Sequence, residues 1–212
     1  MRPALSWSDL PGRRVGVYGL GREGTASVRA CRARGIDPIL VDDTPQSVDV
    51  VQAGLSGSTV LDTADGGAQA LAGCDVVILS PGISRYGPVA TRLQDKGIEL
   101  VGGLGLWLAG ADLDRVICIT GTKGKSTTTA ITGHLLAALG IRARTGGNIG
   151  VPPYDPLLTG APDGPDGPDG ELAEPQLWVI EVSSYQAASL ACLLYTSPSP
   201  RDQRGSRMPS SA

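Results

Sequence analysis

Several residue types that often build functional sites are scarce in this sequence of 212 residues. Phenylalanine is absent, and the one histidine, His134, lies in the middle of a predicted helix, where histidines are more often packed or solvated than catalytic. The four cysteines are far apart and form no Cys-x-x-Cys pair: Cys31, Cys74, Cys118 and Cys192. This spacing argues against a zinc site or a disulfide framework and predicts reduced thiols.

Long apolar runs are missing too. No stretch approaches the length needed to span a membrane, and the first residues lack the apolar core of a signal peptide. A net charge of -3 gives no overall field that would recruit nucleic acid or an anionic membrane. We therefore expect a cytoplasmic, monomeric protein that binds neither nucleic acid nor membrane.

The residues that are present favour a folded α/β protein. Hydrophobic residues make up 41% and charged residues 18% of the chain, enough for one large domain or two small ones. Strands are predicted over residues 14–18, 37–43, 74–82, 98–103 and 115–120, and helices over residues 25–35, 88–97 and 126–139. A further strand followed by the start of a helix is predicted over residues 176–190. This alternation is typical of βαβ units in parallel sheets.

The pattern divides the chain into three parts. Residues 1–106 are predicted to form a Rossmann-like parallel-sheet domain, and residues 107–191 an incomplete P-loop-type α/β domain. Three consecutive Pro-Asp-Gly units at residues 162–170 predict a flexible surface loop. From about Cys192 the sequence is rich in Ser, Pro and Arg and has no periodicity. We interpret residues 192–212 as a disordered or unrelated tail, outside the fold.

The first glycine-rich loop is Gly19-Leu20-Gly21-Arg22-Glu23-Gly24, which follows a strand and opens a helix. Asp42 ends the next strand, at a suitable distance for an acid that binds ribose. Taken alone, this pattern is a dinucleotide fingerprint, and an NAD(P)-dependent oxidoreductase is one reading of it. A glycine turn that only allows the helix to pack on the sheet is the structural alternative.

The second loop, Gly121-Thr122-Lys123-Gly124-Lys125-Ser126, resembles a P-loop, although its first glycine stands closer to the lysine than the strict motif requires. Its backbone N–H groups can form an anion nest, Lys125 can reach the β- and γ-phosphates, and Ser126 can coordinate Mg²⁺. A P-loop kinase or GTPase would share this loop, but would not need a preceding βαβ nucleotide domain.

Two further features lie near the end of the sequence. Glu181 ends the strand at residues 177–181, where a second Mg²⁺ ligand would belong beside a P-loop strand. The alternative is an ordinary carboxylate at a strand end, with Ser183 or Ser184 capping the next helix. The turn Gly146–Gly150 lets the backbone approach a ligand, with Asn148 as a hydrogen-bonding group.

Together, "GTKGKST", "GGNIG" and "VIEVSSYQ", preceded by "GLGREG", "VDD" and "SPGI", resemble the Mur ligases of peptidoglycan synthesis. The combination is most similar to the members that add glutamate, over about residues 10–191. The resemblance implies ATP and Mg²⁺ as cofactors, and UDP-N-acetylmuramoyl-L-alanine and glutamate as substrates. It also implies that ATP phosphorylates the alanine carboxylate and that the glutamate amine attacks the acyl phosphate.

The resemblance assigns roles to particular residues. Lys125 and Glu181 are implied to be catalytic, and Ser126 and Glu181 to hold Mg²⁺. ATP would contact Gly121, Thr122, Lys123, Gly124, Lys125, Ser126 and Thr127. The UDP substrate would contact Leu20, Gly21, Arg22, Glu23, Asp42, Asp43, Ser80, Gly82 and Asn148.

Two points of the resemblance bear on specificity and activity. Lys123 stands where the D-glutamate-adding members usually carry Asn, and a related bacterial group with "GTKGKS" adds L-glutamate, so the stereochemistry stays open here. The family's third domain, with a metal-binding histidine and a carbamylated lysine, has no counterpart in these 212 residues. We therefore also consider a nucleotide-binding fragment without catalysis, and expect this chain alone not to ligate.

Overall fold

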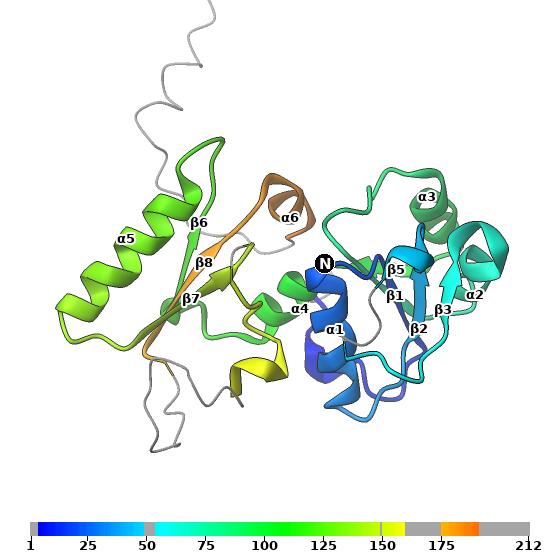
Figure 1. Ribbon diagram of the computed structural model, residues 1–212, viewed down its shortest axis with the longest axis horizontal. Helices are drawn as coiled ribbons and strands as arrows, with labels where there is room; N and C mark the ends of the chain where they lie inside the picture. The colour runs from blue at the N-terminus through cyan, green and yellow to red at the C-terminus, as the bar shows by residue number, and fades with distance from the viewer. Residues whose placement is uncertain (1–3, 49–53, 149, 160–174, 191–212) are drawn as a thin grey trace, which may run out of the picture.

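The computed structural model in Figure 1 describes residues 4–48, 54–148, 150–159 and 175–190. The predicted Pro-Asp-Gly loop and the predicted tail lie outside the described residues. The described residues form two parallel sheets with helices packed against them, which confirms the predicted α/β class. No described helix combines the length and apolarity that crossing a membrane would need.

The first sheet has five parallel strands in the order β3-β2-β1-β4-β5. The strands are β1 (Val15–Tyr18), β2 (Ile39–Asp42), β3 (Val60–Asp62), β4 (Val76–Leu79) and β5 (Glu99–Val101). The helices of this part are α1 (Arg22–Arg32), α2 (Ala68–Leu71), α3 (Pro88–Asp95) and α4 (Gly103–Gly110). Short helical turns are η1 (Trp7–Asp9), η2 (Pro45–Ser47) and η3 (Thr63–Gly67). This order reverses direction between β1 and β4, which is where ligands bind in open α/β sheets.

The second sheet has three parallel strands in the order β6-β8-β7. Its elements are β6 (Val116–Ile119), β7 (Ala143–Gly147), β8 (Leu177–Glu181), α5 (Lys125–Ala138) and α6 (Ser184–Ser189), with the turns η4 (Leu113–Arg115) and η5 (Pro156–Thr159). Helix α5 packs on this sheet but leaves Ile131, Leu135 and Leu139 exposed by 54%, 56% and 74%. The described part of α5 therefore carries an apolar surface that this sheet does not cover.

The sequence analysis did not predict two of the observed strands, β3 and β7. Strand β3 has only three residues, too few to show a hydrophobic period. Strand β7 reads Ala-Arg-Thr-Gly-Gly, which resembles a turn in sequence. Its last glycine, Gly147, has φ 98°, and a Cβ there would lie 2.3 Å from the carbonyl oxygen of Glu181. The glycines are thus needed for close packing beside β8, and not for a turn alone.

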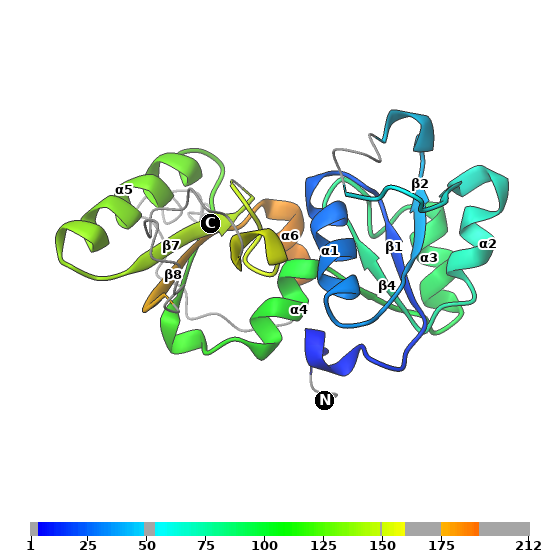
Figure 2. The ribbon, with the colours of Figure 1, turned by 60° about the horizontal axis from the view of Figure 1, so that its bottom comes forward.

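The two sheets share a continuous core. Helices α4 and α6 lie between them in both views (Figures 1 and 2), and α4 contacts α1, η1 and α6. One buried cluster contains Val17 of β1, Leu104 of α4, Ile180 of β8, and Tyr154 from the segment before η5. The predicted division between residues 106 and 107 falls inside α4, so a helix connects the two sheets there.

Candidate functional site

The first glycine loop packs tightly against the loop that follows β4. Gly19 has φ 87°, and a Cβ there would lie 2.7 Å from Ile83 and 2.9 Å from Ser80. A Cβ on Gly24 would lie 1.8 Å from the carbonyl oxygen of Gly19. Gly21 is different, because a Cβ there would have only Ser80 Oγ nearby, at 3.9 Å. Gly19 is therefore required by its positive φ and by the side chains packed against it, and Gly24 by a backbone contact, while Gly21 leaves the exposed side of the loop open to a ligand.

Two aspartates at the end of β2, Asp42 and Asp43, lie beside this loop. Asp42 Oδ2 accepts a hydrogen bond from the backbone N–H of Leu20 at 2.6 Å, and Oδ1 accepts one from Thr44 at 2.9 Å. Asp43 accepts a hydrogen bond from the Tyr18 hydroxyl at 2.7 Å. Burial, with this hydrogen bond to Asp43, raises the pKa of Tyr18 to about 12. Asp42 thus holds the backbone of the loop, Asp43 holds the side chain of Tyr18 just before it, and the side chain of Leu20 is buried in the core.

The second loop presents free backbone donors at the start of α5. Gly124 has φ 81°, and no side chain among the described residues caps the N-terminus of α5, so its first-turn N–H groups are available to an anion. Residues 121–124 are exposed, as are Ser126 and Thr127. Lys125 Nζ donates a hydrogen bond to the carbonyl oxygen of Gly121 at 2.8 Å. This hydrogen bond holds the lysine side chain against the loop.

Glu181 ends the central strand of the second sheet and is only 1% exposed. It pairs with Ile119, just before the second loop, and with Gly147, just before Asn148. Its Oε1 accepts a hydrogen bond from Asn148 Nδ2 at 2.9 Å, whereas its buried Oε2 has no hydrogen-bond partner among the described residues. Leaving such an oxygen unpaired is costly unless a ligand satisfies it, and a cation is the natural ligand for a carboxylate. The unpaired Oε2 of Glu181 therefore suits one ligand of a Mg²⁺ ion, although the described residues bring together no group of three or more His, Cys, Asp or Glu side chains.

Arg22 and Glu23 connect the two sheets. Arg22 donates a hydrogen bond to the backbone carbonyl of Asn148, and Glu23 Oε1 accepts one from Gln186 Nε2 at 2.6 Å. Gln186 closes a capping box with Ser183 at the start of α6. Glu23 is buried, and this burial raises the pKa of its carboxyl group. Its side chain thus points into the protein, between the two sheets.

A pocket of about 350 Å³ lies between the first sheet and α6. Its lining includes Glu23, Ser80, Tyr86, Tyr185 and Gln186. Of the residues predicted from sequence, the pocket brings Glu23 and Ser80 together, while Lys125, Ser126 and Gly82 are not part of its lining. Gly82 is exposed in the turn after β4.

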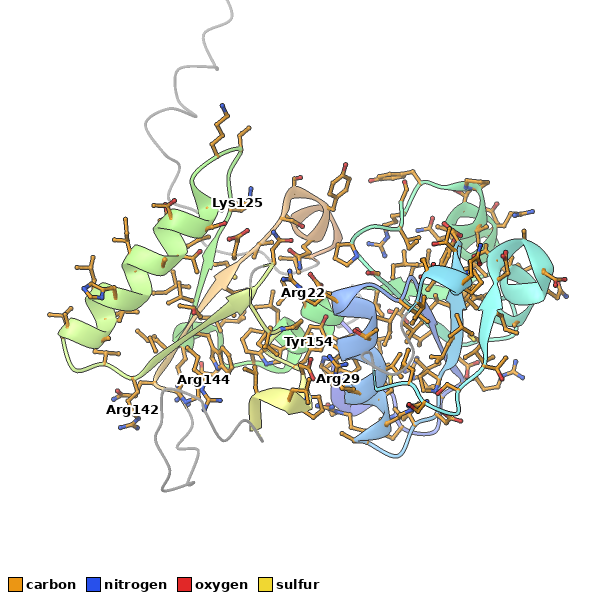
Figure 3. All side chains as sticks on the ribbon, viewed as in Figure 1. Arg22, Arg29, Lys125, Arg142, Arg144 and Tyr154 are labelled. Atoms are coloured by element: carbon orange, nitrogen blue, oxygen red, sulfur yellow. The ribbon has the colours of Figure 1, made fainter. Side chains whose placement is uncertain are left out.

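Sequence reasoning missed three members of the junction between the sheets. Gln186 belongs to a Ser-x-x-Gln capping signature that could have been recognised, but its partner Glu23 is 163 residues away. Arg29 Nη2 contacts Asp155 Oδ2 at 2.6 Å, and no local pattern predicts this ion pair. In Figure 3, Arg22, Arg29 and Tyr154 all lie where α1 faces the second sheet, and Lys125 stands at the N-terminal end of α5.

Comparison with known proteins agrees with these features. Residues 13–102 match the family described as the N-terminal domain of MurD-like Mur ligases. Proteins named UDP-N-acetylmuramoyl-L-alanine–L-glutamate ligase from Salinispora tropica and Xylella fastidiosa (strain Temecula1) are 40% and 42% identical over 185 and 190 residues. The matches cover 86% and 87% of this chain, which spans 38% of the length of each relative.

A solved murein peptide ligase from Psychrobacter arcticus is a more distant likeness, with 22% identity and a TM-score of 0.43. The match covers 80% of this chain and 37% of that one. The chain is thus similar to Mur ligases over most of its length, and its residues 13–102 match the MurD-like N-terminal domain of that family.

Proposed function

We propose that this chain is part of an ATP-dependent ligase that joins L-glutamate to UDP-N-acetylmuramoyl-L-alanine in peptidoglycan synthesis. The observation that carries the proposal is the buried carboxylate of Glu181, whose Oε2 has no hydrogen-bond partner among the described residues. Glu181 ends β8, which pairs with β6, the strand that leads into the glycine-lysine-serine loop at the uncapped start of α5. The names of the curated relatives, together with Lys123 in "GTKGKS", support L-glutamate over D-glutamate.

In this proposal the second loop holds ATP. The N–H groups of residues 121–127 would bind its phosphates, and Lys125 would exchange its hydrogen bond with the Gly121 carbonyl for one with a phosphate oxygen. Ser126 and Glu181 would hold Mg²⁺, which would offset negative charge on the phosphates. Positioning and electrostatic stabilisation of this kind provide most of the rate in phosphoryl transfer.

The first sheet would hold the UDP substrate. At the switch point between β1 and β4, a Cβ on Gly21 would lie 3.9 Å from Ser80 Oγ, and Ser80 also lines the pocket of about 350 Å³, whose volume lies within the size range of ligand sites. The N-terminus of α1 likewise has no side-chain cap, which suits the diphosphate. Asn148 lies between this crevice and Glu181, near the place where the reacting carboxylate would meet ATP.

Transfer of the γ-phosphoryl group of ATP to the alanine carboxylate would give an acyl phosphate and ADP. Attack by the amine of L-glutamate would then form the amide and release phosphate. We expect the protein to act in the cytoplasm as a monomer, without nucleic acid or membrane. Because the chain spans 38% of the relatives' length, binding without turnover is the second function that we consider for these 212 residues.

Titration calorimetry tests the ATP assignment. A non-hydrolysable ATP analogue with Mg²⁺ should bind the unaltered protein, and Lys125→Ala should weaken binding at least about tenfold, since a charge-assisted contact is lost. Lys123→Ala, in the same exposed loop, is the matched control and should have a smaller effect. Equal effects of the two substitutions would contradict a phosphate cradle centred on Lys125.

A second titration compares ligands for the first loop. UDP-N-acetylmuramoyl-L-alanine should bind, and Gly21→Ala should weaken this binding because a methyl group would enter the open side of the loop. NAD should bind much more weakly. Tight binding of NAD, with none of the UDP compound, would favour the oxidoreductase reading instead.

A further inference from the structure

The start of α1 makes two contacts that reach across to the second sheet, on either side of Glu181. Arg22 donates to the carbonyl oxygen of Asn148, whose side chain in turn donates to Glu181. The next residue, Glu23, accepts from Gln186, five residues after Glu181. Figure 3 shows Arg22 directed from α1 towards the second sheet. Two consecutive residues of the first glycine loop thus contact both chain segments that flank the buried carboxylate.

The environment of Glu23 argues against direct contact with a diphosphate. The residue is 8% exposed, and its carboxylate accepts from Gln186 at 2.6 Å and from the Tyr154 hydroxyl at 3.5 Å. Tyr154 is itself buried and packs against Trp7, with ring centroids 5.3 Å apart. A carboxylate would also repel an anionic ligand at short range. Although Glu23 lines the pocket of about 350 Å³, its buried hydrogen bonds suit a structural link between the sheets better than a contact with an anionic ligand.

Gln186 can transmit the position of Glu23 to Glu181. Its Oε1 accepts from the N–H of Ser183 at 2.7 Å, and its own N–H donates to Ser183 Oγ at 3.2 Å. This capping box fixes the turn that follows β8, and Val182 donates to the carbonyl of Ile119, beside the second loop. A shift of Gln186 would therefore move the short segment between Glu181 and α6.

We propose that Glu23 is a positioning residue that couples the two ligand-binding loops through Gln186. By holding Gln186, it fixes the start of α6, and with it Glu181, against the first glycine loop. The coupling rests on the proposed function, since it requires ligands at both loops, but the Glu23–Gln186 link does not. Occupation of one loop then favours the arrangement that the other loop needs, so each ligand tightens the binding of the other.

An exchange of the two side chains isolates this link. Gln186→Glu places two carboxylates at hydrogen-bond distance, whereas the double variant Glu23→Gln/Gln186→Glu restores one donor and one acceptor with the roles reversed. The glutamate introduced by Gln186→Glu can still accept from Ser183, so the capping box survives in both variants. Gln176→Glu is the matched control, because Gln176 is exposed and its Oε1 only accepts from the backbone N–H of Arg142.

Hydrogen exchange of the ligand-free 212-residue protein, followed by mass spectrometry, tests the link itself. Gln186→Glu should speed the exchange of the α6 amides on the order of tenfold, the effect expected for losing one hydrogen bond to a charged group. The double variant should exchange its α6 amides at nearly the rate of the unaltered protein, and Gln176→Glu should not change this rate. Gln186→Met removes the donor without adding a charge, and it replaces Gln186→Glu if that variant does not fold.

Calorimetry then tests the coupling. The affinity for UDP-N-acetylmuramoyl-L-alanine is measured with and without the ATP analogue and Mg²⁺. The analogue should tighten binding about tenfold in the unaltered protein and in the double variant, with little effect in Gln186→Glu. If the Glu23–Gln186 contact were merely structural, its loss would lower the stability of the protein without changing the ratio of the affinities for UDP-N-acetylmuramoyl-L-alanine measured with and without the ATP analogue.

The outcomes separate the two proposals. If the double variant exchanges as fast as Gln186→Glu, the Glu23–Gln186 link is wrong. If both ligands bind the unaltered protein without influencing each other, or if Gln186→Glu keeps the full ratio, the coupling is wrong. If neither ligand binds the unaltered protein while the exchange rates follow the swap, the proposed function fails and the link stands.

Discussion

Gly24 offers a sharp test of how the first glycine loop is built. It is the third residue of α1, where alanine would ordinarily favour the helix by about 1 kcal/mol over glycine. In this protein, however, a Cβ on Gly24 would lie 1.8 Å from the carbonyl oxygen of Gly19 and 2.9 Å from its carbonyl carbon. Both atoms belong to the backbone, so no side-chain rotation can relieve the contact.

The clash should outweigh the gain in helix propensity. Overpacking in a well-packed site typically costs about 1–3 kcal/mol, and a contact with backbone belongs at or above the upper end of that range. We therefore expect Gly24→Ala to lower the free energy of unfolding by about 2 kcal/mol or more, after the propensity gain is subtracted. This is a large share of the 5–15 kcal/mol, roughly, that stabilises a typical domain.

Gly21→Ala is the matched control, three residues earlier in the same loop. Gly21 has φ -67°, which alanine adopts freely, and the nearest atom to its Cβ would be Ser80 Oγ at 3.9 Å. Its cost should stay below about 1 kcal/mol, since it only replaces glycine by alanine at a helix N-cap. Urea unfolding followed by circular dichroism measures the change in unfolding free energy for both Gly24→Ala and Gly21→Ala. A Gly24→Ala protein as stable as Gly21→Ala would refute the packing argument.

Three further predictions concern buried charge and pH. Glu181→Gln should raise the unfolding free energy of the ligand-free protein by about 1 kcal/mol, because a buried negative charge is replaced by a neutral amide of the same shape. The same substitution should abolish Mg²⁺-dependent binding of the ATP analogue. Thermal unfolding checks the first effect and calorimetry the second. Arg29→Leu should lower the free energy of unfolding in urea by about 3–5 kcal/mol, because Asp155 is left buried without its ion-pair partner. The double variant Arg29→Leu/Asp155→Asn should lower it by less, because the buried charge is removed as well. Since folding raises the pKa of Tyr18 from 10.0 to about 12, its contribution to stability is complete below pH 10 and is lost as the pH rises towards 12. Urea unfolding across this range should therefore show a loss of stability that is smaller in Tyr18→Phe, and an equal loss in both proteins would count against the raised pKa.

Local sequence patterns were sufficient to predict most of the regular structure. The apolar runs of β1, β2, β4, β6 and β8 alternate with helix-compatible segments, so the α/β class with parallel strands follows from periodicity and connection length. The Ser183 cap of α6 also follows from a local signal. The assignments of ATP, Mg²⁺ and the UDP substrate to individual residues stay predictions, as does the division of the chain at residues 106 and 107.

The sequence by itself therefore determined the element types, the positions of the two glycine-rich loops and the similarity to Mur ligases, because each depends on a short stretch of neighbouring residues. Only the tertiary structure decided where the polar side chains of those loops point. Glu23 lines the pocket and accepts a hydrogen bond from Gln186, and Asp42 accepts one from the backbone N–H of Leu20. Such pairings join residues 22 to 163 positions apart, and their energy depends on burial and orientation, which arise only when the sheets, α4 and α6 pack together.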